Sequence, residues 1–345
     1  MRTRFDSVAR WLHRLGATTA AVRIGSRRLT TLCYHGVAPY LPGADRFAVK
    51  AHLDCDLFRR QLAWLGTHMR FVDLETVLGA IDRGHRLPKR AVLLTFDDAF
   101  LNNLTYALPI LKEYGARPVF FVPSEPLNMP GRKLWYSRLA WVASLATEST
   151  LRVPGGDSGA GWSVQSIKDR WATSDRLFEL VSSWDAARRD NFISELEVIN
   201  PMSAASKEAE AYFFSHMSWE QLRGIAGSEV DVGGHTATHA ALSHVDESEA
   251  RREVAENYET LRDRLGVAPI VFAYPFGSRS FCGPREEAIV RDAGYSAAFT
   301  LVPPYMEGDA NRFALPRRNV APVCFEMFTF LISRLSDLPM RFRER

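Results

Sequence analysis

The alternation of short apolar runs with amphipathic segments is the feature that most limits how this chain can fold. The runs are four to six residues long and fall at positions 29–34, 91–96, 118–122, 229–232, 270–274 and 297–301. Amphipathic stretches separate them, and the clearest fall at positions 56–65, 103–114 and 247–265. Strands that alternate with helices predict a mainly parallel sheet or an α/β barrel. In such folds the chemistry takes place at the carboxyl ends of the strands.

Composition and charge fit a globular protein with one barrel and insertions. The chain has 345 residues, of which 46% are hydrophobic and 24% are charged. The net charge is only +3 and no long run of Lys or Arg occurs, so we do not expect a nucleic-acid partner. The cysteines lack C-x-x-C spacing, which argues against a zinc–thiolate site and is typical of a reduced, cytosolic protein. They are Cys33, Cys55, Cys282 and Cys324.

Residues 1–28 form a basic N-terminal region, with seven Arg against one Asp. Arg residues interrupt every apolar stretch there, so we do not expect a signal peptide, and no later stretch predicts a membrane span. We favour a solvated helix that covers one end of the domain, in a cytoplasmic protein. The alternative is peripheral contact with the inner membrane face through an amphipathic helix. Its apolar face would hold Phe5, Val8, Trp11 and Leu12.

The strand–helix rhythm stops between about residues 124 and 217, where we expect a largely helical insertion without strands. This segment holds five of the eight Trp, most of which we expect in the core of a helical subdomain. Ser218 and Gln221 in "MSWEQL" form a capping box that predicts where the regular fold resumes. We therefore divide the chain into residues 1–28, a main domain at 29–320, and a C-terminal helix and basic tail at 321–345.

The stretch "VLLTFDDAF" ends a predicted strand with two adjacent carboxylates, Asp97 and Asp98. Their repulsion calls for a nearby cation. In "DVGGHTATHAAL", His235 and His239 lie four residues apart after another strand. Two His and one carboxylate bind a divalent metal and leave coordination positions open. We therefore expect Asp98, His235 and His239 to bind the metal, while Asp97 stays free as a base.

A third stretch, "VFAYPFG", is an apolar strand that ends in a Pro–Phe–Gly turn. Such a tight turn lets a backbone N–H point at a reacting oxygen. The histidine spacing alone would occur by chance on many surfaces. The acidic pair and the histidine pair at strand ends, in this order, make a much more specific pattern.

Together, "TFDD", "HTATHAAL" and "FAYPFG" resemble the polysaccharide deacetylase family with the NodB homology domain, carbohydrate esterase family four. The resemblance implies a distorted (β/α) barrel with a divalent metal, commonly zinc. It also implies hydrolysis of an N-acetyl group on a hexosamine, or sometimes of an O-acetyl ester. By position, Asp97 matches the family's catalytic base and Phe276 the residue whose backbone N–H helps to form the oxyanion hole. Asp98, His235 and His239 match the metal ligands.

The chain departs from the family pattern in three places. Ala273 stands where the family usually has the Arg that holds the base, and we expect Arg317 in "LPRRNV" to act instead, with Arg318 on the opposite face. Deacetylases of the exopolysaccharide poly-N-acetylglucosamine type resemble the chain here. The late motif with the general-acid His is not evident, and neither is the Asp/Trp motif. Our candidate proton donor is His35 in "LCYHGV", since related deacetylases carry a similar Tyr-His; the alternative is a structural His.

The sequence thus predicts a zinc-dependent hydrolase that removes an N-acetyl group from an amino sugar. The substrate would be a polysaccharide, as in exopolysaccharide biosynthesis, an oligosaccharide or a glycoconjugate precursor. One alternative is an O-acetyl esterase or N-deformylase that acts on a lipid- or nucleotide-linked sugar. A second alternative is an inactive carbohydrate-binding barrel. The pattern does not predict the oligomeric state.

Overall fold

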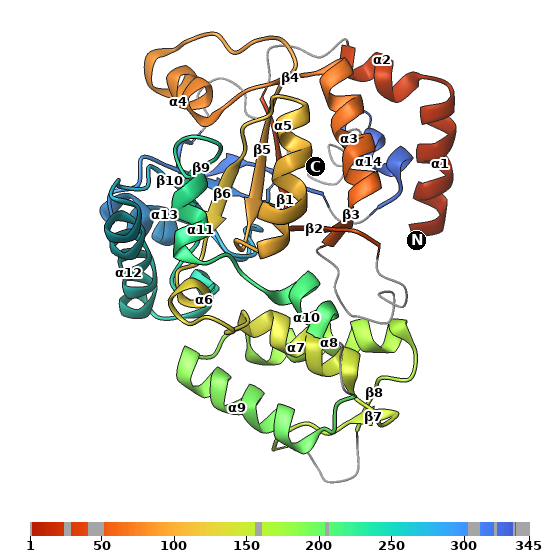
Figure 1. Ribbon diagram of the computed structural model, residues 1–345, viewed down its shortest axis with the longest axis vertical. Helices are drawn as coiled ribbons and strands as arrows, with labels where there is room; N and C mark the ends of the chain where they lie inside the picture. The colour runs from red at the N-terminus through yellow and green to blue at the C-terminus, as the bar shows by residue number, and fades with distance from the viewer. Residues whose placement is uncertain are drawn as a thin grey trace.

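A nearly closed parallel sheet forms the centre of the molecule (Figure 1). The computed structural model describes residues 2–23, 29–40, 52–155, 161–203, 207–302, 311–320, 323–333 and 335. Within these residues every strand pairing of the main sheet is parallel. The strand order is β12 (Leu315–Pro316), β11 (Ala297–Thr300), β10 (Val271–Ala273), β9 (Asp231–Gly234), β6 (Val119–Val122), β5 (Ala91–Asp97), β1 (Thr30–Tyr34) and β13 (Arg318–Asn319), with β4 (Arg70–Phe71) paired to β5. The predicted (β/α) barrel is confirmed.

The two ends of this sheet belong to one short segment. β12 pairs with β11 and β13 pairs with β1, and only Arg317 separates β12 from β13. The Arg317 N–H still donates to the Thr300 carbonyl at 3.1 Å, while the Val320 N–H donates to the Cys33 carbonyl at 2.8 Å. The chain therefore passes from one edge of the sheet to the other at Arg317, which closes the barrel there.

All six predicted runs contain strands, with ends displaced by at most two residues. The largest displacement is at the predicted strand 229–232, where β9 covers Asp231–Gly234 instead. The N–H groups of Glu229 and Val230 both donate to the Ile225 carbonyl, so a turn after the preceding helix occupies them. The short strands β4, β12 and β13 and the pair β2 (Gly36–Ala38) and β3 (His52–Asp54) were not predicted. Two or three residues are too few to produce a readable alternation.

Helices cover the outside of the barrel (Figure 1). They are α3 (Cys55–His68), α4 (Leu74–Arg83), α5 (Leu108–Glu113), α11 (Trp219–Ile225), α12 (Glu247–Leu265) and α13 (Pro284–Asp292). The Ser218–Gln221 capping box is confirmed at the start of α11. The amphipathic stretch predicted at 103–114 is helical, but it begins as a π-helix, Asn103–Ala107, before it continues as α5. Pro109 has no N–H to donate into an α-helical pattern, which explains the change.

The insertion between β6 and β9 forms a separate layer below the barrel in Figure 1. Its helices are α6 (Glu125–Asn128), α7 (Trp135–Leu145), α8 (Ile167–Val181), α9 (Ala186–Ile199) and α10 (Lys207–Phe214). Leu139, Leu177 and Ile193 are fully buried in its own core. The prediction that it has no strand is wrong, because β7 (Thr150–Leu151) and β8 (Trp162–Ser163) pair antiparallel. Two-residue strands leave no periodic signal in a sequence.

At the N-terminus, α1 (Arg2–Arg14) and α2 (Ala17–Arg23) pack beside α14 (Phe325–Ile332). His13 Nδ1 and Thr329 Oγ1 share a hydrogen bond of 3.0 Å across this contact. The structure does not describe the Phe5 side chain, residues 24–28 or most of the predicted basic tail. Among the described residues, none of the helices combines the length and hydropathy needed to cross a bilayer. The division at residues 28 and 320 stays a prediction.

Candidate active site

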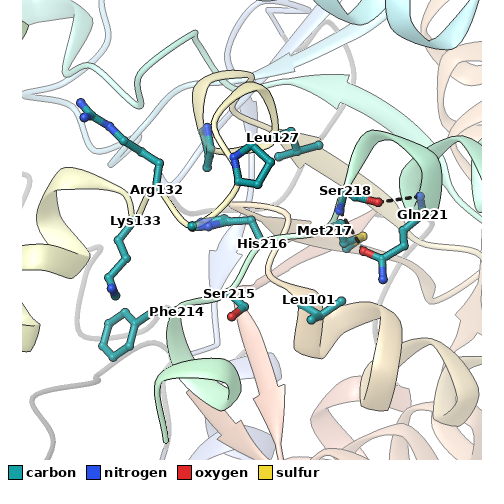
Figure 2. A pocket seen from close by; sticks show the side chains of 13 residues that line it. Leu101, Leu127, Arg132, Lys133, Phe214, Ser215, His216, Met217, Ser218 and Gln221 are labelled. Carbon is teal, nitrogen blue, oxygen red and sulfur yellow. Dashed lines mark hydrogen bonds between the residues drawn. The ribbon is translucent and has the colours of Figure 1, made fainter. Parts of the chain in front are cut away.

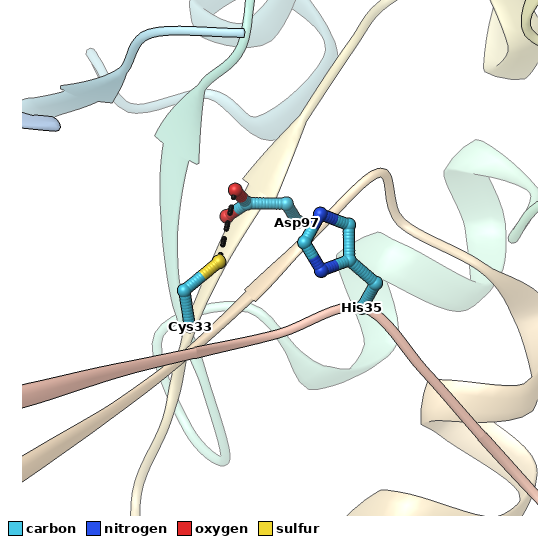
Figure 3. A group of neighbouring side chains, drawn as sticks. All are labelled: Cys33, His35 and Asp97. Carbon is cyan, nitrogen blue, oxygen red and sulfur yellow. Dashed lines mark hydrogen bonds between the residues drawn. The ribbon is translucent and has the colours of Figure 1, made fainter. Parts of the chain in front are cut away.

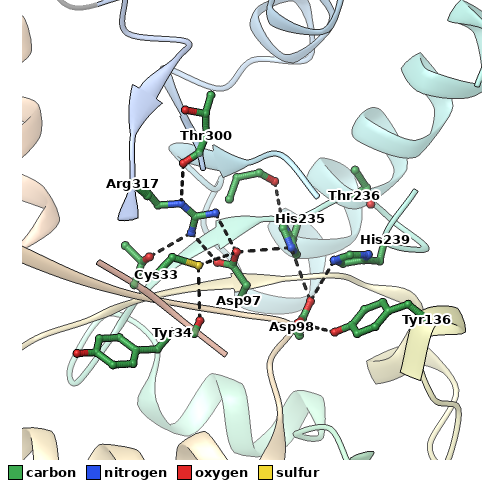
Figure 4. A network of polar contacts seen from close by, with 12 residues as sticks. Cys33, Tyr34, Asp97, Asp98, Tyr136, His235, Thr236, His239, Thr300 and Arg317 are labelled. Carbon is green, nitrogen blue, oxygen red and sulfur yellow. Dashed lines mark hydrogen bonds and ion pairs between the residues drawn. The ribbon is translucent and has the colours of Figure 1, made fainter. Parts of the chain in front are cut away.

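The acidic pair lies at the carboxyl end of β5. Asp97 is the last residue of the strand, and the next residues, Asp98 and Ala99, have positive φ values of 76° and 52°. Residues with side chains rarely adopt this left-handed conformation, and it is frequent where a site requires a sharp turn. The turn sends the two carboxylates toward different partners, with both side chains buried (Figure 4).

Asp98 faces the two predicted histidine ligands. Its Oδ1 lies 3.3 Å from His239 Nε2 and 3.7 Å from His235 Nε2. Ligand atoms about 2.0–2.1 Å from a tetrahedral metal are separated by about 3.3 Å, so the spacing fits one ion. Asp98 Oδ1 is buried and makes no hydrogen bond within the described part of the chain. An unpartnered buried carboxylate oxygen beside two imidazoles is the donor set that a divalent metal would use.

The surroundings of His235 prepare it as a ligand. Its Nδ1–H donates to the Ala273 carbonyl at 2.7 Å, which leaves the Nε2 lone pair directed toward Asp98. Burial lowers the pKa of His235 to about 4, so the imidazole is neutral near pH 7, as a metal ligand must be. Burial alone would raise the pKa of Asp98, but the contact with His239 and the nearby His35 and His235 together outweigh it and lower that pKa. Ala273 thus replaces an Arg in the sequence pattern yet contributes its carbonyl group.

Asp97 is held by Arg317 in a two-pronged ion pair. Arg317 Nη1 donates to Asp97 Oδ1 at 2.6 Å, and Nη2 donates to Oδ2 at 2.8 Å. The guanidinium is only 1% exposed and also donates to Thr95 Oγ1 and to the Thr300 carbonyl. Burial alone would raise the pKa of Asp97, but the Arg317 charge and hydrogen bonds, together with the nearby His235 and His35, outweigh it and lower that pKa. The barrel closure between β12 and β13 therefore delivers the cation that keeps Asp97 ionised.

His35 lies on the same rim, directly after β1 (Figure 3). Ligand atoms of Cys33, His35 and Asp97 all lie within 4.8 Å of one another. Cys33 Sγ donates to Asp97 Oδ2 at 3.3 Å, a contact that sequence reasoning missed. The sequence shows only that Cys33 lies two residues before His35 in "LCYH", a spacing that directs two side chains of an extended segment to the same side. The structure therefore brings His35 beside the predicted base.

The insertion also reaches the predicted metal ligands. The Tyr136 hydroxyl donates to Asp98 Oδ2 at 2.6 Å, and the Tyr136 ring centre lies 4.9 Å from that of His239. The neighbouring Trp135 Nε1–H donates to the His239 carbonyl at 3.0 Å. Burial raises the pKa of Tyr136 well above its ordinary value, so the phenol keeps its proton and donates. Sequence reasoning missed both residues, because "LWYS" lies outside the motifs that carry the resemblance.

The turn after β10 completes the surroundings of His239. Phe276 has a φ of 61°, and its ring centre lies 4.7 Å from that of His239. At Gly277 a Cβ atom would lie 2.7 Å from the backbone nitrogen of Leu301, so only glycine fits. The structure thus places Phe276 at the site, while the aim of its N–H at an oxyanion stays a prediction.

A pocket of about 340 Å³ lies between the insertion and the segment Asp98–Leu101 that follows β5, here called the acidic loop (Figure 2). Leu101 from that loop and Arg132, Lys133 and His216 from the insertion line part of it. The Leu101 N–H donates to the Ser215 carbonyl at 2.8 Å, which ties the two walls together. Both parts of the chain therefore shape the surroundings of the loop that carries Asp98.

Comparisons with known proteins identify a family and a fold to which the chain is similar. A family model described as polysaccharide deacetylase matches residues 84–133 and 198–298, on both sides of most of the insertion. The matched segments include Asp97, Asp98, His235, His239 and Phe276, whereas His35 and Arg317 lie outside them. No curated protein matches the chain by sequence.

Solved structures share the fold at low sequence identity. IcaB from Ammonifex degensii is 21% identical with a TM-score of 0.56, covering 89% of this chain and 98% of its own. The Streptococcus pyogenes deacetylase PplD, solved in complex with acetate, is 17% identical with a TM-score of 0.56, covering 86% and 93%. A de-N-acetylase from Aggregatibacter actinomycetemcomitans is 15% identical with a TM-score of 0.52, covering 84% and 94%. The matched family model and the barrel shared with these structures thus make the chain similar to the polysaccharide deacetylase family, whose members are hydrolases of acetylated sugars.

Proposed function

We propose that the protein is a metal-dependent hydrolase that removes an N-acetyl group from an amino sugar in a polysaccharide, oligosaccharide or glycoconjugate precursor. The supporting observation is the unequal treatment of two adjacent carboxylates. Asp98 faces two imidazoles with an unpartnered oxygen, whereas Asp97 is paired with the Arg317 guanidinium. One carboxylate is thus suited to bind a cation and the other to accept a proton.

Asp98, His235 and His239 would hold the ion, with zinc the first choice for this donor set. When bound, the metal supplies a Lewis acid for the acetyl carbonyl and for the attacking water. Asp97 accepts the proton of that water as the new C–O bond forms. The Phe276 N–H donates to the oxyanion. His35 then gives a proton to the sugar nitrogen as the C–N bond breaks, so that acetate and a free amine leave.

The test is acetate release from N-acetylglucosamine oligomers, measured before and after a chelator and again after zinc is restored. We expect activity that the chelator abolishes and zinc recovers. O-acetylated and N-formylated sugars, free and linked to a lipid or nucleotide, serve as matched substrates for the alternative reactions. A zinc-loaded protein that is inert toward every N-acyl sugar would reject the proposal. Sugar binding without turnover would favour the carbohydrate-binding barrel.

We also propose peripheral contact with the inner membrane face through α1. Val8 and Trp11 from the predicted apolar face are 49% and 62% exposed, and Leu15, directly after α1, is 63% exposed at the same helical spacing. Leu12, which was also predicted on that face, is only partly exposed. Exposed Arg10 and Arg14 lie on the same helix, so anionic lipid headgroups would match its charge. The cytoplasmic location remains part of this proposal.

Flotation with phosphatidylglycerol vesicles tests the membrane contact, with phosphatidylcholine vesicles as the control. Trp11→Ser should lose binding. Val198→Ser should not, because Val198 is exposed on α9 instead. Equal flotation of both variants would reject α1 as the contact.

A further inference from the structure

A second group of metal-binding side chains lies beside the proposed metal site. It consists of Cys33 and His35, at the end of β1, and Asp97, at the end of β5 (Figure 3). Cys33 and Asp97 are buried, whereas His35 is partly exposed. The spacing of cysteines in the sequence gave no hint of this group, since its members come from two neighbouring strands.

The distances suit an ion of the size of zinc. A sulfur about 2.3 Å and an oxygen about 2.0 Å from a tetrahedral metal are separated by about 3.5 Å. Cys33 Sγ and Asp97 Oδ2 are 3.3 Å apart, and the donor atoms of all three residues lie within 4.8 Å of one another. Small side-chain movements would therefore bring three different donors around one ion.

We propose that Cys33, His35 and Asp97 form a second, weaker metal site that takes thiophilic divalent cations such as Zn²⁺, Cd²⁺ or Co²⁺. Thiolate and imidazole donors favour these ions over Mg²⁺ and Ca²⁺. The thiol now donates its proton toward Asp97 Oδ2. On binding, the S–H bond breaks, a metal–sulfur bond forms, and the proton leaves to solvent.

Two features of its surroundings should give this second site a lower metal affinity than the first. Arg317 already donates to both oxygens of Asp97, and its charge repels a second cation. The Cys33 thiol must also give up its proton in a fully buried position. The site formed by Asp98, His235 and His239 lacks both obstacles. Asp98 Oδ1 has no hydrogen-bond partner within the described residues, and the hydrogen bonds of the Arg317 side chain go to Asp97, Thr95 and Thr300.

The two sites meet at the catalytic base. Asp97 Oδ2 is 3.3 Å from Cys33 Sγ on one side and 3.9 Å from His235 Nε2 on the other. An ion at the second site would occupy the oxygen that accepts the proton and the imidazole that donates one. Excess metal should therefore inhibit the enzyme, a consequence that rests on the proposed function.

The direct test is a Co²⁺ titration of the metal-free protein, followed by absorption spectroscopy. The first equivalent should give no thiolate-to-cobalt charge-transfer band, because Asp98, His235 and His239 contain no sulfur. Further equivalents should produce that band in the wild type and in the control Cys282→Ser, but not in Cys33→Ser. No thiolate band at any ratio, or a band that persists in Cys33→Ser, would overturn the proposal.

The second arm measures acetate release at one equivalent of Zn²⁺ and at increasing excess. The rate of each protein is expressed as a fraction of its own rate at one equivalent of Zn²⁺. For the same fractional loss of activity, Cys33→Ser should need at least about tenfold more zinc than the wild type. Activation by excess zinc, or equal inhibition of both proteins, would overturn the inhibitory role. If neither the wild type nor the variant releases acetate, the proposed function is rejected. The cobalt band still tests whether Cys33 binds a metal, because that measurement does not depend on activity. Should Cys33→Ser not fold, His35→Ala must raise the Co²⁺ concentration that half-saturates the band by about tenfold.

Discussion

The barrel and the insertion contribute different kinds of groups to one site. From the barrel come the charged side chains and the proposed metal ligands, which lie at strand ends, in the loops that follow them or at the barrel closure: Asp97, Asp98, His235, His239 and Arg317. The insertion contributes neutral donors, the Tyr136 hydroxyl to Asp98 and the Trp135 indole to the His239 carbonyl. The insertion is therefore more than an addition to the outside of the barrel, because it donates hydrogen bonds to two of the proposed ligands that the barrel carries.

The chemical difference sets the expected sizes of mutational effects. Removing one partner of a buried ion pair leaves an unpaired charge and costs about 3–5 kcal/mol. A hydrogen bond to a charged group contributes about 1.5–3 kcal/mol. Changes in the barrel should therefore abolish metal binding or turnover, whereas changes in the insertion should weaken them.

The largest effect is expected from replacing a proposed ligand. Asp98→Ala, His235→Ala and His239→Ala should each lose most of the bound metal, since a three-residue site keeps little affinity with two. Elemental analysis after purification in zinc and removal of free metal measures this. His68→Ala on α3 is the matched control and should keep its metal. Full metal content in all three site variants would reject this ligand set.

The second prediction separates the base from the ligands. Asp97→Asn keeps the shape of the side chain but cannot accept a proton. We expect the metal content to stay and kcat to fall by roughly a hundredfold or more, the scale for a lost general base. If turnover survives, then another residue accepts the proton.

The third prediction concerns the barrel closure. Arg317→Lys replaces a planar fork that donates to both oxygens of Asp97 with a single point charge. Metal should remain, and kcat/KM should fall by roughly tenfold to a hundredfold. Because Arg317 holds the pKa of Asp97 down, its loss raises that pKa, and the acidic limb of the kcat/KM profile moves to higher pH.

Arg318→Lys provides the control for Arg317→Lys. Arg318 follows in β13 and is only partly buried, so its replacement should change kcat/KM little. An unchanged acidic limb in Arg317→Lys would mean that Arg317 does not set the ionisation of Asp97.

Sequence reasoning succeeded where a chemical group adjoins a long strand. Ala91–Asp97 is a seven-residue buried strand, so its apolar run and the carboxylates at its end were both readable. Arg317 was selected because Ala273 left the base without its usual partner, and the ion pair with Asp97 is present. The strand break that delivers Arg317 was not predicted, because β12 and β13 have two residues each.

The unpredicted parts depend on contacts between distant segments. Tyr136 meets Asp98 across 38 residues, and no local pattern in "LWYS" says which surface α7 will face. Cys33 meets Asp97 only because β1 and β5 are neighbours in the sheet. Local periodicity encodes which residues are buried on a strand or helix, but it does not encode these pairings.

The smallest effect, and the sharpest test of the comparison, is expected from Tyr136→Phe. The substitution keeps the ring against His239 but removes the hydrogen bond that fixes Asp98 Oδ2. Zinc affinity, measured by competition with a chelator, should weaken by about tenfold, at the low end for an outer partner of a metal ligand. Tyr212→Phe, in the same insertion, is the control, because the Tyr212 ring stacks on Tyr106 instead. If Tyr136→Phe binds zinc as tightly as the wild type, then the barrel orients Asp98 without help from the insertion. The insertion would then have no part in the metal site.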